Sequence, residues 1–269
     1  MPRLNTLVVA GLGAALLAHT RQRRDSAERF AAALLETLLN AIDATDAETG
    51  RHVRRVARYA LVLADVARLS TEAQREVEWV ALFHDIGKIH EALFDAVHDR
   101  NELTPAERAA ISTHPERGAQ VLAPLTAFFP GLPRGVLAHH ERWDGTGYPG
   151  GLDGQAIPLA ARIVTIADSF DAITHQRRYR PGRSLRVGFD AIRDGAGAQF
   201  DPRLARLFLR REVRARIRAE CASAEQPAEP PGPGDRRAPA DRLRAPRVAF
   251  RWRTSGLARA SQSATERAP

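Results

Sequence analysis

The chain contains histidine and aspartate residues of the kind that bind divalent transition metals. His84 and Asp85 follow the apolar run 80–83, which is expected to be buried, so both polar groups are carried toward an interior where bare charge is costly. An isolated His-Asp pair more often satisfies helix ends than binds an ion. Five further candidates are expected at helical or helix-end positions: His52, His114, His139, His140 and Asp168. This set predicts a metal centre with imidazole and carboxylate ligands.

The spacing of these residues favours a site with more than one ion. Neighbours on a helix point about 100° apart, so His84 and Asp85 can each serve a different ion, as can the adjacent residues 139–140, with a carboxylate such as Asp85 bridging. Glu48 lies four residues before His52 and can face the same side of a helix. Two ions about 3.5–4 Å apart lower the pKa of a shared water and stabilise the attacking and leaving oxygens in phosphoryl transfer. The mixed ligand set suits Fe, Mn or, less well, Zn.

Basic residues near these candidates can contact phosphate. Lys88 lies one helical turn beyond Asp85, where its ammonium can either neutralise charge on a phosphate or simply pair with Asp85. Arg177, Arg178 and Arg180 can hold phosphates by forked hydrogen bonds. Alone, the three arginines would be a surface charge run, but beside a metal site they predict a substrate clamp.

The segments that must position these residues have the periodicity of helices. No stretch alternates with period two for long enough to predict a sheet, so the fold class is all-α. Asp25 and Glu28 resemble a capping pair. The helix that they start is expected to pack through one apolar face, formed by Phe30, Leu34, Leu38 and Ile42. The next helix follows the turn 46–50, and its arginines are expected to be solvated: Arg51, Arg54, Arg55 and Arg58.

Helix signals also surround the later candidates. Ser70 and Thr71, with Gln74 three residues after the threonine, start the helix that ends at His84 and Asp85. The segment 104–107, Thr-Pro-Ala-Glu, starts another helix, which is expected to run to His114, where Pro115 disrupts it. A short helix precedes the 139–140 pair, segment 143–151 has too many glycines to be anything but a shaped loop, and helical period returns over 157–174.

Both ends differ from this body. Residues 4–18 form an uncharged apolar run that would span about 22 Å as a helix, which is short for a bilayer core of about 30 Å. If it inserts, the arginines at 21–24 place the rest of the chain in the cytoplasm. A cleaved signal peptide or a simple packing helix are the alternatives. We therefore predict three parts: an apolar segment 1–24 that can contact a membrane, a domain over 25–212, and an Arg/Pro/Ala-rich disordered tail over 213–269.

Composition limits the classes of function. With 269 residues and 44% hydrophobic residues, the chain can bury one good-sized core. One cysteine excludes a disulfide framework and fits a reducing compartment. The net charge of +8 resides almost entirely in residues 236–269, which hold nine arginines against two acidic residues. The body is close to neutral, so no nucleic-acid partner is expected.

The candidates and their surroundings resemble the HD-GYP family, a branch of the HD phosphohydrolases that opens cyclic di-GMP. The resemblance covers roughly residues 26–210. It rests on motifs that recur in the order and spacing of the family, namely His52, His84-Asp85-Ile86-Gly87-Lys88, Thr113-His114-Pro115, His139-His140-Glu141-Arg142-Trp143-Asp144-Gly145-Thr146-Gly147-Tyr148-Pro149, Ala167-Asp168-Ser169-Phe170-Asp171-Ala172, Arg177 and Tyr179-Arg180.

The resemblance implies an HD-domain bundle of about seven helices and a set of site roles. Two or three divalent ions, Fe or Mn, would be bound by His52, His84, Asp85, His114, His139, His140 and Asp168, with Glu48 supporting a third ion. Asp85 and Lys88 would be catalytic. Lys88, Tyr148, Arg177 and Arg180 would contact the substrate, and the loop 147–149 would also contact other signalling proteins. The implied reaction is hydrolysis of cyclic di-GMP to linear pGpG and further to GMP, in bacterial second-messenger signalling.

The chain also departs from the family pattern. Residues 99–101, Asp-Arg-Asn, stand where many members have Lys-Pro-Gly, and Gln176 and Arg178 replace the usual acid and proline beside Arg177. These differences put nucleotide preference in question more than metal chemistry. Two alternatives therefore stay open: hydrolysis of another cyclic dinucleotide, and a nucleotide-sensing or protein-interaction module with little turnover. The oligomeric state is not predicted.

Overall fold

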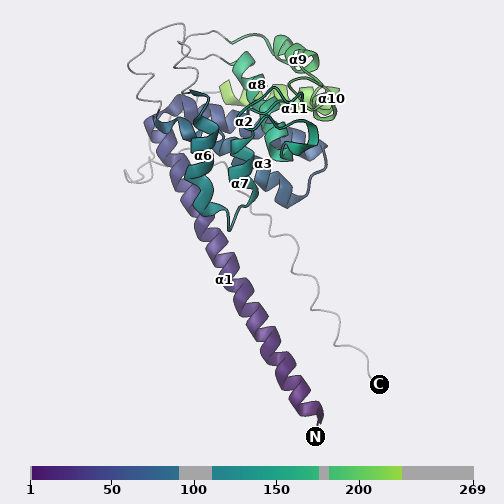
Figure 1. The fold of residues 1–269 in the computed structure, drawn as a ribbon. Coiled ribbons are helices and arrows are strands. Elements are labelled where there is room, and N and C mark those ends of the chain that lie inside the picture. The colour runs from purple at the N-terminus through teal and green to yellow at the C-terminus, as the bar shows by residue number, and fades with distance from the viewer. Residues whose placement is uncertain (1, 91–110, 176–181, 226–269) are drawn as a thin grey trace, which may run out of the picture. The chain divides into compact units, whose positions relative to one another are not determined.

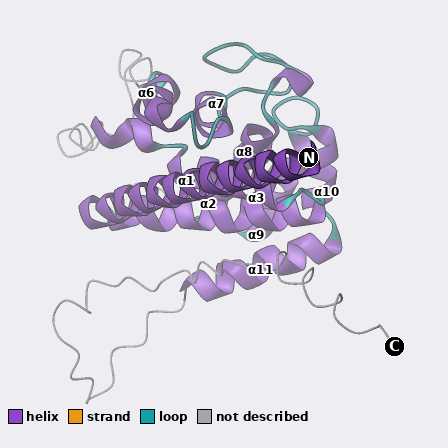
Figure 2. Cartoon of the chain, turned by 90° about the horizontal axis from the view of Figure 1, so that it is seen from below, coloured by secondary structure: helices purple, strands orange, loops and turns teal. Residues whose placement is uncertain are grey.

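The computed structural model describes residues 2–90, 111–175 and 182–225. Within these ranges the chain is helical and has no strand, which confirms the predicted all-α class (Figures 1 and 2). The α-helices described are α1 (Pro2–Thr45), α2 (Ala47–Val66), α3 (Thr71–Phe83), α6 (His114–Leu122), α7 (Gly131–Leu137), α8 (Leu159–Thr174), α9 (Leu185–Asp194), α10 (Pro202–Phe208) and α11 (Arg211–Glu225). Three short 3₁₀ helices join them: η1 (Ile86–His90), η2 (Ala123–Leu125) and η3 (Gly154–Ala156).

Helix α2 lies at the centre of the fold and packs against α1, α3, α8 and α11. It begins where Asp46 accepts a hydrogen bond from the Glu48 backbone amide, which satisfies one of the unpaired donors of the first turn. Its buried face repeats with helical spacing through Val53, Val56, Ala60 and Leu63. This face fixes the rotation of α2, and so directs His52 toward α8.

Helix α3 carries the His84-Asp85 pair into the interior. It begins at Thr71, where the sequence predicts a helix start, and Ser70 caps it by accepting a hydrogen bond from the Ala73 amide. The last turns are apolar and buried, so the helix packs on both α2 and α8 before ending at Phe83. His84 and Asp85, which follow Phe83, therefore lie in a turn inside the protein rather than on its surface.

Helix α1 differs from its prediction in two ways. It is continuous over 44 residues, about 66 Å at 1.5 Å per residue, so no cap at Asp25 separates an N-terminal segment from the domain. The face that packs on α2 contains Ala31, Leu35, Leu39 and Ile42, whereas Phe30 and Leu34 are 67% and 48% exposed. The sequence offers apolar residues on two faces, and the alanine-containing face is the one that packs against α2. No helix in the described ranges combines the length and apolar character needed to cross a bilayer.

Two further boundaries correct the sequence analysis. Pro115 lies in the first turn of α6, which begins at His114, because a residue without an amide proton fits a position where that proton would have no partner. The helix start predicted at 104–107 lies outside the described residues. Residues 213–225, which are predicted as part of a disordered tail, are instead helical, since α11 runs to Glu225 and buries Val213, Ile217 and Cys221. The spacing of four between these residues gives one apolar face, which the arginines around it obscure in the composition. Residues 226–269 lie outside the described ranges.

Candidate metal centre

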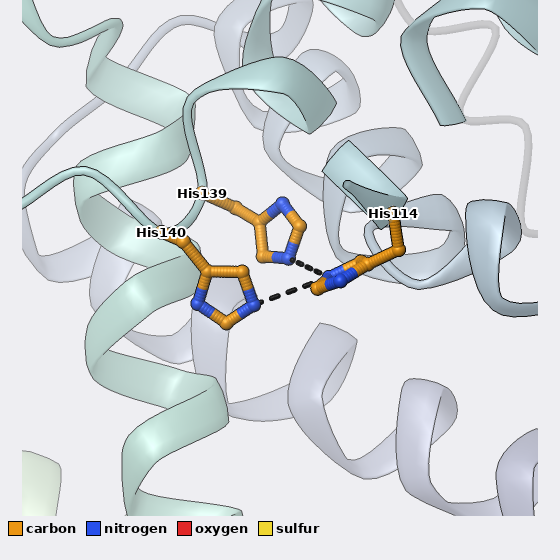
Figure 3. A group of neighbouring side chains, drawn as sticks. All are labelled: His114, His139 and His140. Carbon is orange, nitrogen blue, oxygen red and sulfur yellow. Dashed lines mark hydrogen bonds between the residues drawn. The ribbon is translucent and has the colours of Figure 1, made fainter. Parts of the chain in front are cut away.

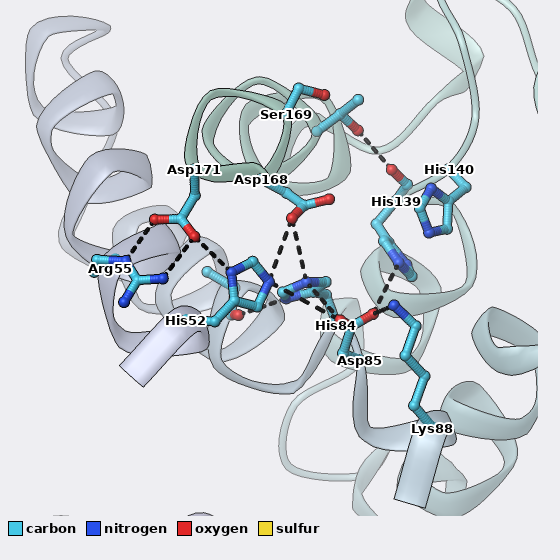
Figure 4. A network of polar contacts seen from close by, with 12 residues as sticks. His52, Arg55, His84, Asp85, Lys88, His139, His140, Asp168, Ser169 and Asp171 are labelled. Carbon is cyan, nitrogen blue, oxygen red and sulfur yellow. Dashed lines mark hydrogen bonds and ion pairs between the residues drawn. The ribbon is translucent and has the colours of Figure 1, made fainter. Parts of the chain in front are cut away.

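Seven predicted residues meet between α2, α3, α6, α7 and α8. His52 comes from α2 and Asp168 from α8, while His84 and Asp85 follow α3 (Figure 4). His114 opens α6, and the adjacent residues 139–140 follow α7 (Figure 3). The ligand atoms of six of them form two groups, each with all members within 4.8 Å of one another: His114, His139 and His140 in one, and His52, His84 and Asp85 in the other. We call these the His114 group and the His52 group. The seventh residue, Asp168, lies beside His52 and His84.

The Asp85 carboxylate lies between the two groups. Its Oδ1 atom is 3.4 Å from Nε2 of His114 and 4.0 Å from Nε2 of His139. Its Oδ2 atom is 3.4 Å from Nε2 of His84 and 4.0 Å from Nε2 of His52. Each oxygen therefore faces one group, which is the arrangement that a carboxylate bridging two ions requires.

Local backbone contacts set the tautomer of three imidazoles. His84 Nδ1 lies 2.8 Å from the Ala81 carbonyl oxygen, and His114 Nδ1 and His139 Nδ1 each lie 2.6 Å from the carbonyl oxygen three residues earlier. A carbonyl oxygen can only accept, so each Nδ1 carries the proton and donates it. In the neutral form of each ring the lone pair is then on Nε2, the atom that faces the other candidates. A histidine that binds a metal commonly donates its other ring N–H to an acceptor of this kind.

The nitrogen atoms of the His114 group are arranged to bind a cation. His114 Nε2 lies 3.2 Å from Nε2 of His139 and 3.2 Å from Nε2 of His140 (Figure 3). Burial, with nearby Lys88, lowers the pKa of His114 to about 4, and burial likewise lowers the pKa of His140 to about 4 and that of His139 well below its ordinary value. At neutral pH, His114 and His139 therefore direct two bare lone pairs at each other, and a positive ion between them relieves the repulsion.

The His52 group favours positive charge in another way. His52 Nε2 lies 3.4 Å from Asp168 Oδ1, which is also 3.9 Å from His84 Nε2 (Figure 4). Burial opposes a charge on His52, but the contacts with Asp168 and Asp171 outweigh burial and raise its pKa to about 9. Nε2 of His52 and Nε2 of His84 are buried without a hydrogen bond. Together with Asp168, the group thus attracts a cation and offers it two imidazoles and two carboxylates, a donor set for Fe, Mn or Zn.

A pocket of about 210 Å³ opens beside both groups. Asp85, Lys88, His139, His140 and Asp168 line it on the metal-centre side. Arg142, Ser169 and Gln199, to which the sequence assigns no role, add further polar atoms. Lys88 Nζ lies 2.8 Å from Asp85 Oδ1, so the pairing that the sequence left open is present, and its ammonium also reaches the pocket (Figure 4).

The Tyr148 loop is attached to the same site. The Tyr148 ring stacks on His140 with centroids 4.9 Å apart, and its amide donates to the His140 carbonyl at 3.3 Å. Glu141 is 2% exposed and accepts from the Gly150 and Leu152 amides, which closes the loop. The segments 99–101 and 176–180, with Arg177 and Arg180, lie outside the described residues.

Comparison with known proteins identifies the family. The family model described as HD domain matches residues 36–204, which is more than half of the chain.

The chain belongs to the HD domain family.

Curated relatives support the HD-GYP resemblance within the HD domain family. The cyclic di-GMP phosphodiesterase response regulator RpfG of Xanthomonas campestris is 36% identical over 74% of this chain and 52% of its own length. A cyclic di-GMP phosphodiesterase of Thermotoga maritima is 35% identical over 69% and 50%, and the 3′3′-cGAMP-specific phosphodiesterase 2 of Vibrio cholerae is 34% identical over 65% and 34%. This HD domain chain therefore spans between a third and about half of the length of these relatives. A solved cyclic GMP-AMP-specific phosphodiesterase of Vibrio cholerae has 22% identity and a TM-score of 0.49, covering 73% of this chain and 55% of that one.

Glu48 stands apart from the two groups of this HD domain. Its side chain is exposed, and it belongs to neither set of converging ligand atoms. We expect Glu48→Ala to leave the number of metal ions bound per chain unchanged, because exposed surface substitutions have small effects. Metal quantification by mass spectrometry checks this. One ion fewer per chain would show that Glu48 supports a third ion.

Gly87 allows η1 to pack closely against α6. A side chain at this position would collide with the His114 carbonyl oxygen and lie 2.7 Å from the Gly118 amide nitrogen. Gly87→Ala should therefore push η1 away from α6, separate Asp85 from the His114 group and destabilise the fold by about 1–3 kcal/mol. Urea unfolding with and without Mn²⁺ measures both effects. Unchanged stability and unchanged Mn²⁺ affinity would contradict this account of the close packing.

Proposed function

We propose that this chain is a metal-dependent phosphodiesterase that hydrolyses cyclic di-GMP to pGpG and then to GMP. The observation that carries the proposal is the position of Asp85, with one oxygen toward each of two histidine groups beside a pocket. One ion would be held by His52, His84 and Asp168, and a second by His114, His139 and His140, with Asp85 shared between them. Fe or Mn suits this mixture of imidazole and carboxylate donors.

Such ions, when bound, make water a stronger nucleophile and stabilise negative charge on the attacking and leaving oxygens. The residues of the chain do the rest. Lys88 reaches the pocket with its ammonium and would neutralise a phosphate oxygen there while keeping Asp85 ionised. Burial would raise the pKa of Asp85, but Lys88 and His84 outweigh it and hold that pKa well below its ordinary value. Tyr148 would pack against the nucleotide while stacked on His140, and Arg177 and Arg180 would clamp its phosphates.

The choice of cyclic di-GMP follows from the names of the relatives. Proteins at 35–36% identity are cyclic di-GMP phosphodiesterases, and others at 34–35% identity are specific for 3′3′-cGAMP. 3′3′-cGAMP is therefore the alternative substrate to be compared with cyclic di-GMP. The two differ in one base, so discrimination must come from groups that contact the base edge rather than from the metal centre.

A substrate panel tests the proposal. The full-length protein, loaded with Mn²⁺, is given cyclic di-GMP, 3′3′-cGAMP and pGpG at equal concentrations, and products are separated by chromatography. The highest kcat/KM is expected for cyclic di-GMP, with pGpG as the first product. A higher value for 3′3′-cGAMP would reassign the substrate. Tight binding of cyclic di-GMP without cleavage would instead support a nucleotide-sensing module.

The location and partners belong to the same proposal. The protein would act in the cytoplasm, a reducing compartment that its single cysteine fits, and the apolar residues 4–18 would touch the inner face of the membrane. The loop 147–149 would contact other signalling proteins. Cell fractionation of the protein with and without residues 1–24 tests this. Loss of the protein from the membrane fraction on deletion is expected, and an unchanged distribution would exclude membrane contact through this segment.

A further inference from the structure

His52 is positioned differently from the other histidines with a fixed tautomer. His84, His114 and His139 each donate Nδ1–H to a carbonyl three residues earlier, so their orientation is set within one turn of chain. The acceptor for His52 is the Asp171 carboxylate on α8, 119 residues away, with Nδ1 and Oδ2 2.7 Å apart (Figure 4). The orientation of His52 thus depends on a charged group from another helix.

Asp171 is fully occupied by nitrogen atoms. Besides His52, it accepts from Arg55 Nε at 2.7 Å and Arg55 Nη2 at 3.0 Å, and His175 Nδ1 lies 3.1 Å from Oδ1. Four nitrogen atoms surround two oxygens that can accept about four hydrogen bonds. The side chain is 1% exposed. Asp171 therefore has no acceptor site left for an ion, in contrast to Asp85 and Asp168, whose oxygens face the histidine groups.

Arg55 completes this arrangement and corrects a prediction. Arg55 is predicted to lie on a solvated face, but its side chain is 13% exposed and its guanidinium fork contacts Asp171. A forked guanidinium fixes both the charge and the direction of a carboxylate. The imidazole of His52 is consequently held by a carboxylate that cannot itself rotate away.

We propose that Asp171, held by Arg55, is the positioning residue for the His52 half of the metal centre and has no part in the His114 half. This inference rests on the proposed two-ion site. A carboxylate on the far nitrogen of an imidazole fixes the ring and makes the metal-binding nitrogen a stronger donor, and loss of such a partner typically weakens metal affinity 10- to 100-fold. In the His114 half, backbone carbonyls orient His114 and His139. Loss of Asp171 should therefore leave the metal affinity of that half unchanged.

A purely structural ion pair is the competing explanation, because Arg55 and Asp171 also join α2 to α8. The Arg162–Asp201 pair provides a matched control. Arg162 is on α8 as well, its Nη1 lies 2.8 Å from Asp201 Oδ2, and Asp201 is 6% exposed and caps α10. Asp201 is in neither histidine group. Asp201→Asn therefore removes a buried charge that pairs with Arg162 on α8, and leaves the metal centre unchanged.

Metal titration in two backgrounds separates these explanations. His140→Ala damages the His114 half and leaves the ion of the His52 half, whereas His84→Ala does the reverse. Adding Asp171→Asn should raise the Mn²⁺ Kd 10- to 100-fold in the first background and by less than twofold in the second. Asp201→Asn should change neither. Isothermal titration of the full-length protein measures each Kd without reference to activity.

Equal weakening in both backgrounds, or none in either, would overturn the role of Asp171. If Asp171→Asn does not fold by circular dichroism, Arg55→Gln takes its place, with the same pattern expected at smaller size. The wild-type protein keeps the two proposals apart. Two ions per wild-type chain with no response to Asp171→Asn would refute only the positioning role, whereas fewer than two ions in the wild type would refute the two-ion site and this inference with it.

Discussion

Asp85→Ala should release bound metal and lower kcat/KM for cyclic di-GMP by at least about a thousandfold. Asp85 is the only residue of the described site with an oxygen toward each histidine group, so no neighbour can replace it. Charge stabilisation by bound ions is worth several kcal/mol in the transition state, and each 1.36 kcal/mol is tenfold in rate. Metal content by mass spectrometry and initial rates, measured on one preparation, give both numbers.

The control for this substitution is Asp65→Ala. Asp65 lies on α2 with its side chain 57% exposed and pairs with Arg216, so it carries the same charge change outside the site. It should keep wild-type metal content and activity. If Asp85→Ala retains both ions and its activity, Asp85 does not bridge two ions and the ligand assignment is wrong.

Removing the metal should inactivate the protein and lower its melting temperature by about 5–10 °C. An ion present at about 100 times its Kd stabilises the folded state by about 2.7 kcal/mol. For a domain of this size, 1 kcal/mol shifts the melting temperature by about 2–4 °C. The physical source is the set of lone pairs and carboxylates that face one another, including Nε2 of His114 and Nε2 of His139 at 3.2 Å. Differential scanning calorimetry before and after chelation measures the shift.

Restoring the ion is the control for chelation. Mn²⁺ or Fe²⁺ should restore both the melting temperature and the hydrolysis. In Asp85→Ala, chelation and metal addition should each change the melting temperature by less than in the wild type. A metal-free protein that melts at the same temperature as the loaded protein and hydrolyses nucleotide at the same rate would exclude the proposed centre.

The convergence of the site could be predicted because metal-binding residues have few types and regular spacings. His52, His84, His114 and Asp168 lie at helical or helix-end positions that a single sequence reveals, and the structure brings them together. The helices that carry them also have strong local signals, such as the Ser70 cap of α3. Local chemistry therefore determines both the residue types and the segments that position them.

Residues that act through long-range contacts left no such signal. The Arg55–Asp171 pair spans 116 residues, and Arg55 alone is indistinguishable from the solvated arginines near it. The burial of Leu35 rather than Leu34 on α1 depends on which apolar face meets α2, which periodicity within α1 does not decide. The buried side of α11 was hidden by arginines, although Val213, Ile217 and Cys221 repeat at a spacing of four.

The most direct test is hydrolysis of cyclic di-GMP by the full-length protein purified without oxygen, with bound metal quantified in the same sample. Turnover to pGpG or GMP is expected, with at least two Fe or Mn ions per chain. Full metal loading with cyclic di-GMP left intact would contradict the proposed activity.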